Sequence, residues 1–143
     1  MFKTILVPID IAETEPGIVA LELAKDLAKT HGAKLAVMSV IEQVPGYIAT
    51  QVADDVREKV LEEADKRLQA IAKEHGLAGK TEVLVRRGHP STEILKHAKK
   101  TKADMIVVGA HNPGVADYFL GSVAARVVRQ ADCSVLVARK TGG

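Results

Sequence analysis

Short apolar runs alternate along the chain with longer segments in which apolar residues recur every three or four positions. The short runs are nearly continuous and rich in β-branched residues, which is typical of strands buried on both faces of a parallel sheet. The longer segments each carry one apolar stripe and predict amphipathic helices. The predicted strands are residues 4–9, 34–41, 81–85, 103–109 and 134–138, and the predicted helices are residues 14–31, 50–75, 91–100 and 122–131.

Local signals mark the ends of the predicted helices. Thr14 can cap the first helix, Pro16 is tolerated in its first turn, and Gly32 ends it. Gly76 ends the second helix in the same way. Strands separated by helices predict an α/β fold with an open parallel sheet of five strands and helices on both faces. We find no internal repeat and no linker, so we expect one domain over residues 1–143.

Composition and charge argue against several functional classes. The 143 residues include 20 Lys and Arg against 18 Asp and Glu, which leaves a net charge of +2. This balance does not predict attraction to nucleic acid or to a membrane surface. The chain has no Trp to stack on single-stranded bases, and no apolar stretch near the ~20 residues that span a bilayer. The amino terminus enters a strand-like run at once, so we expect a cytoplasmic protein.

The single cysteine and the histidines do not form a recognisable chemical motif. Cys133 has no partner for an internal disulfide, which favours a reducing compartment. It precedes an apolar run, so we interpret it as a packing residue and rank a reactive thiol second. His31, His75, His89 and His97 show no metal-ligand spacing with one another or with Cys133, and no metal site is predicted.

The candidate ligand site lies where the predicted strands end, because parallel sheets bind ligands outside the carboxyl ends of their strands. Asp10 directly follows the first strand, the fourth strand ends at Gly109, and the loop after it closes on Gly121 and Ser122 at a helix start. A glycine there lets a phosphate approach the backbone N–H groups of the helix, and the Ser122 hydroxyl adds a further donor. The alternative is that Ser122 serves only as the helix cap.

Two further polar residues fall at this edge of the sheet. The carboxylate of Asp10 can accept a hydrogen bond from a ribose hydroxyl or an adenine amino group, or it can simply cap the turn that follows. His111 could contact a phosphate or assist a proton transfer, but a loop histidine is more often merely exposed.

Five segments together resemble the universal stress protein family. They are ILVPID, MSVI, RGHPSTEIL, ADMIVVGAHN and LGSVAARVVRQADCSVLVAR, and they cover all five strand–helix units in order. The resemblance implies a parallel sheet in the order 3-2-1-4-5, of the adenine nucleotide alpha hydrolase-like type, usually paired as a homodimer. Nucleotide-binding members of the family carry the pattern G-x2-G-x9-G-[ST].

The resemblance also implies the residues that would surround an adenine nucleotide. In chain order they are Pro8, Ile9, Asp10, Val40, Val108, Gly109, His111, Asn112, Gly121, Ser122 and Val123. The first five of these would border adenine and ribose. The next three would approach the ribose and the phosphates, and the last three would hold the phosphates at the helix start.

The chain departs from the family pattern in two ways. Asn112 stands where the second glycine would be, and its distance from Gly121 is one residue short. The loop between Ala110 and Ser122 contains no Lys or Arg and one acid, Asp117, whereas a triphosphate carries several negative charges. We therefore expect either ATP held with modest affinity and help from a divalent cation such as Mg²⁺, or a preference for a less charged adenine nucleotide.

Two functional classes remain open at this point. One is an adenine-nucleotide-responsive binding module that acts in the stress response. The other is a nucleotide-independent interaction protein or chaperone-like stress factor with a vestigial pocket. The chain has no G-x4-G-K-[ST] loop and no phosphate-clamping lysine in its glycine loop, so an enzyme ranks third, with slow ATP hydrolysis at most.

The last predicted strand suggests how two copies would meet. Val135, Leu136 and Val137 form an apolar run on the expected edge strand, and an open edge favours pairing. In the resembled family these strands pair across a twofold axis, which predicts a homodimer. The alternative is that Arg139 and Lys140 protect the edge of a monomer.

Overall fold

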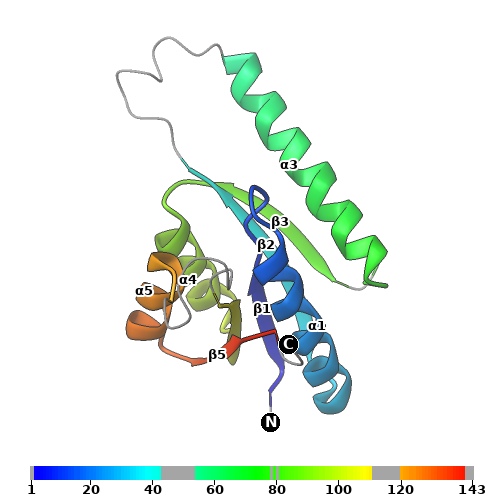
Figure 1. Cartoon of the computed structure of the whole chain (residues 1–143), viewed down its shortest axis with the longest axis vertical. Helices are drawn as coiled ribbons and strands as arrows, with labels where there is room; N and C mark the ends of the chain where they lie inside the picture. The colour runs from blue at the N-terminus through cyan, green and yellow to red at the C-terminus, as the bar shows by residue number, and fades with distance from the viewer. Residues whose placement is uncertain (1, 43–53, 78, 80, 111–119, 141–143) are drawn as a thin grey trace.

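The computed structural model describes residues 2–42, 54–77, 79, 81–110 and 120–140. Its five strands form one sheet in the order β3-β2-β1-β4-β5, and all four strand pairs are parallel (Figure 1). The strands are β1 (Thr4–Pro8), β2 (Lys34–Ile41), β3 (Glu82–Arg87), β4 (Met105–Gly109) and β5 (Ser134–Ala138). The described helices are α1 (Glu15–His31), α3 (Asp54–Glu74), α4 (Pro90–Thr101) and α5 (Ser122–Gln130). The predicted fold class and strand order are confirmed.

Helices cover both faces of the sheet and leave β1 at its centre (Figure 1). Alternate residues of β1 point to opposite faces, so Ile5 and Val7 join one core while Leu6 joins the other. The first core packs under α1 and α3, and the second packs under α4 and α5. All three β1 residues are almost completely buried, which explains why the strand reads as a continuous apolar run.

The start of α1 differs from the prediction. Thr14 stands at the cap position, but its backbone is already helical and its side chain makes no capping hydrogen bond. A capping side chain binds the N–H of the second or third helical residue, and here the second is Pro16, which has none. Gly32 ends the helix as predicted, in the left-handed conformation with φ 64°.

The other element boundaries shift by a few residues. β1 stops at Pro8, one residue before the predicted end, and β3 runs from Glu82 through Arg86 and Arg87 rather than stopping at Val85. The two arginines pair in register with Val40 and Ile41 of β2, although their side chains are exposed. No helix within the described residues combines the length and the apolar character that crossing a membrane requires.

The acidic residue before β4 holds the amino end of β1. The carboxylate of Asp104 accepts hydrogen bonds from the backbone N–H groups of Lys3 at 2.7 Å and Thr4 at 2.8 Å. These two bonds favour the ionised form and lower the pKa of Asp104.

We predict that Asp104→Asn lowers the free energy of unfolding at pH 7. A carboxyl whose pKa is lowered by folding contributes stability above its unfolded pKa and loses it as the pH falls through the folded value. Urea unfolding should therefore show a lower midpoint for the variant at pH 7, and the two proteins should converge under acid conditions where Asp104 is protonated. If the urea midpoints of the two proteins differ by the same amount at pH 7 and under acid conditions, this account is wrong.

Candidate functional site

Nine of the eleven predicted site residues line one cavity of about 710 Å³. The cavity lies outside the carboxyl ends of β1, β2 and β4, and the start of α5 closes one side. The nine residues are Pro8, Ile9, Asp10, Val40, Val108, Gly109, Gly121, Ser122 and Val123. The remaining two, His111 and Asn112, lie outside the described residues.

Asp10 follows the end of β1 and organises the turn into α1. Its Oδ1 accepts a hydrogen bond from the N–H of Ala12 at 2.9 Å, and its carbonyl accepts one from the N–H of Glu13 at 3.2 Å. The turn-capping alternative for Asp10 is thus realised. The Asp10 Oδ2 makes no hydrogen bond to a described residue, so one carboxylate oxygen of this cavity-lining side chain remains available to a ligand.

The helix start at α5 differs by one residue from the alternative considered for Ser122. Gly121 takes the cap position, and Ser122 is the first helical residue. The first helical hydrogen bond runs from the N–H of Ala125 to the carbonyl of Gly121 at 2.8 Å. The N–H groups of Ser122, Val123 and Ala124 therefore have no acceptor within the helix, and all three residues line the cavity.

Helices α1 and α4 also begin at this cavity, but each offers fewer donors. Pro16 is the second residue of α1 and Pro90 is the first residue of α4, and both line the cavity. Proline has no backbone N–H, so each of these prolines leaves the first turn of its helix with one N–H donor fewer. Among these three helix starts, α5 is the one best equipped to receive an anion.

Gly109 has a packing role that does not depend on any ligand. A Cβ built on Gly109 would lie 2.1 Å from the carbonyl oxygen of Pro16 and 2.3 Å from its carbonyl carbon. The end of β4 and the first turn of α1 thus approach too closely for a side chain. This contact fixes the position of α1 relative to the cavity, which both residues line.

Arg126 links the two helices on the same side of the sheet. Its guanidinium donates hydrogen bonds to the hydroxyls of Ser91 at 2.8 Å and Thr92 at 2.9 Å, in the first turn of α4. It also donates through Nε to Gln130 at 3.3 Å. Arg126 is thus directed toward α4 and is not among the described residues that line the cavity.

Sequence reasoning missed two acidic residues at the cavity. Glu13 in the turn before α1 and Glu42 just beyond β2 line it together with Asp10, and none of the described lining residues is Lys or Arg. The rule that ligands gather at the carboxyl ends of parallel strands would have indicated Glu42, which directly follows a predicted strand. Glu13 is three residues beyond Asp10 and gave no sequence signal.

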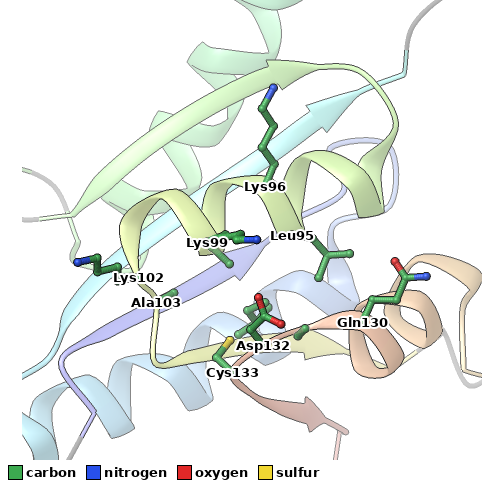
Figure 2. A pocket seen from close by; sticks show the side chains of 11 residues that line it. Leu95, Lys96, Lys99, Lys102, Ala103, Gln130, Asp132 and Cys133 are labelled. Atoms are coloured by element: carbon green, nitrogen blue, oxygen red, sulfur yellow. The ribbon is translucent and has the colours of Figure 1, made fainter.

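A second recess, of about 500 Å³, lies between α4 and the start of β5 (Figure 2). Two of its charged lining residues, Lys96 and Lys102, point away from Cys133 (Figure 2). Cys133 is partly buried against the second core, and this burial raises the pKa of its thiol. These features support the packing interpretation of Cys133, because only the thiolate is nucleophilic. In the described part of the chain, no cluster of three or more His, Cys, Asp or Glu side chains could hold a metal ion.

Comparisons with known proteins give matches over almost the whole chain. The model of the universal stress protein family matches residues 1–139. The chain is 38% identical over 143 residues to a protein of Thermus aquaticus named universal stress protein in QAH/OAS sulfhydrylase 3′region, and the match covers 97% of this chain and 100% of that one.

Solved structures of similar proteins match the fold of this chain. That of hypothetical protein MJ0577 is 26% identical with a TM-score of 0.81, covering 100% of this chain and 99% of that chain. A universal stress protein solved in complex with cAMP is also 26% identical, with a TM-score of 0.63 and 98% of both chains covered. With the family model, the curated relative and the fold in agreement, the chain belongs to the universal stress protein family.

Proposed function

We propose that this chain is an adenine-nucleotide-binding module that acts in the stress response. The observation that carries the proposal is the convergence of nine predicted site residues, from four separate segments, on one cavity of about 710 Å³. A volume of this size suits a small-molecule ligand. A related universal stress protein, 26% identical to this chain, has been solved in complex with cAMP, which supports an adenine nucleotide as the ligand.

The lining of the cavity suggests how the nucleotide would lie. The apolar side chains of Val40 and Val108 suit the faces of adenine, and the available oxygen of Asp10 suits a ribose hydroxyl. The N–H groups of Ser122 and Val123 would receive a phosphate at the start of α5. The base and the phosphate are then held by different walls of one cavity.

The proposal is tested by measuring adenosine and AMP binding to the purified protein by isothermal titration calorimetry. Val40→Trp places an indole in the space proposed for adenine and should weaken AMP binding by about tenfold or more. Val128→Trp is the matched control, because Val128 is 44% exposed on α5 and does not line the cavity. Circular dichroism should show both variants folded.

The opposite result would favour a different function. If the wild-type protein binds no adenine ligand, the nucleotide-independent interaction or chaperone-like role becomes the better explanation. If both tryptophan variants weaken binding equally, the ligand lies elsewhere. Rapid ATP hydrolysis is no part of this proposal, and we assign no catalytic residue.

We further propose a cytoplasmic homodimer joined through β5. This strand is at the edge of the sheet, and Val135, Leu136 and Val137 are only partly buried in the chain by itself. An edge strand with open main-chain groups and apolar side chains favours pairing with a second copy. Sedimentation equilibrium at micromolar concentration should give the dimer mass, and a monomer there would refute this pairing.

A further inference from the structure

We infer that the cavity selects adenine ligands by phosphate charge and takes a nucleoside monophosphate in preference to a triphosphate. This inference rests on the proposed adenine-nucleotide function and adds a specificity to the same site. It follows from the balance of charge around the cavity, because a triphosphate brings more negative charge into the same space than a monophosphate does.

The cavity carries negative charge of its own. Asp10 and Glu42 line it, and no described lining residue is Lys or Arg. Each added phosphate group is therefore placed near carboxylates, and no described lining residue offers a Lys or Arg side chain to offset it.

The positive charge that the fold offers is small. The start of α5 is equivalent to about half an elementary charge, which offsets part of one phosphate group but not three. Two basic residues near this end of the sheet have other partners. Arg126 is bonded to Ser91 and Thr92 in α4, and Lys140 lies 3.4 Å from the carboxylate of Glu15.

Metal-assisted binding of a triphosphate is the competing arrangement. Mg²⁺ is held by phosphate oxygens and waters together with one or two carboxylates, and carboxylates border this cavity. The inferred preference therefore applies to nucleotides without a bound divalent cation, where the carboxylates repel each added phosphate group.

The test compares adenosine, AMP and ATP by titration calorimetry at low ionic strength without divalent cations. We expect AMP to bind about tenfold more tightly than ATP. The ratio of the two affinities should decrease at high salt, because salt screens the repulsion between the phosphates and the carboxylates. Glu42→Gln should reduce the ratio of AMP to ATP affinity by about twofold to fourfold. Glu62→Gln, an exposed position on α3 that does not line the cavity, controls for the change in net charge.

The outcomes separate this inference from the proposed function. ATP binding as tightly as AMP without divalent cations would overturn the selectivity while leaving the adenine site intact. A ratio that Glu42→Gln and Glu62→Gln change equally would also overturn it, because the effect would then not come from the cavity. Failure of adenosine, AMP and ATP alike to bind would refute the proposed function, and the selectivity with it.

Discussion

Replacing Gly109 by alanine should lower the free energy of unfolding by about 3 kcal/mol, a large effect for a single added methyl group. The new Cβ would lie 2.1 Å from the carbonyl oxygen of Pro16, a contact with backbone that no rotamer can relieve. β4 and the first turn of α1 would have to separate. Urea unfolding followed by circular dichroism measures the change, and AMP binding should fall in parallel because Pro16 and Gly17 line the cavity.

Gly32→Ala is the matched control for Gly109→Ala. Gly32 ends α1 with φ 64°, and nothing lies within 4 Å of a Cβ added there. Alanine at this position carries only the cost of a left-handed backbone, about 1 kcal/mol. If the two variants lose the same stability, close packing of β4 against α1 does not explain the glycine at position 109.

The strands of this fold were predictable because its sheet is buried on both faces. β2 is an example, with four consecutive buried residues, Leu35, Ala36, Val37 and Met38. Because side chains on both faces of this strand are buried, every position favours an apolar residue, and the sequence shows a continuous apolar run. The order of the strands was not contained in that pattern. It came from the resemblance to a known family, since periodicity says which segments are strands but not which of them are neighbours.

Element boundaries were less predictable because they depend on single hydrogen bonds. Thr14 has the right chemistry for a cap, yet Pro16 removes one of the N–H groups it would bind. Arg86 and Arg87 belong to β3 through backbone pairing with β2, and an edge strand can carry exposed charges that hydrophobic periodicity does not count. Such details follow from partners that the local sequence does not reveal.

The candidate site was predictable where its residues lie next to strand ends. Gly109 is the last residue of β4 and Asp10 lies two residues beyond the end of β1, and both line the cavity. The carboxylate of Glu13 was missed because it reaches the cavity through the turn that Asp10 organises, which is a tertiary effect. Gly109 was found for a different reason from the one observed: it was assigned to ligand approach, and the structure gives it a contact with Pro16.

Asp10→Ala should weaken adenosine binding by about tenfold to one-hundredfold, because it removes a carboxylate acceptor proposed for the ribose. The same substitution removes the hydrogen bond from the N–H of Ala12, so a loss of affinity alone does not identify the cause. Adenosine is the appropriate ligand for this measurement, since it has no phosphate and does not respond to the charge of Asp10 in the way that AMP does.

A second ligand separates the two roles of Asp10. The wild-type protein should bind adenosine more tightly than 2′,3′-dideoxyadenosine, which lacks the 2′ and 3′ hydroxyls but keeps the 5′ hydroxyl, and Asp10→Ala should lose this preference. Asp10→Asn keeps an acceptor for the N–H of Ala12 and should retain part of the preference, since its amide oxygen accepts a weaker hydrogen bond than a carboxylate does. If Asp10→Ala weakens both nucleosides by the same factor, the residue acts on the ligand only through the turn, and the ribose contact is wrong.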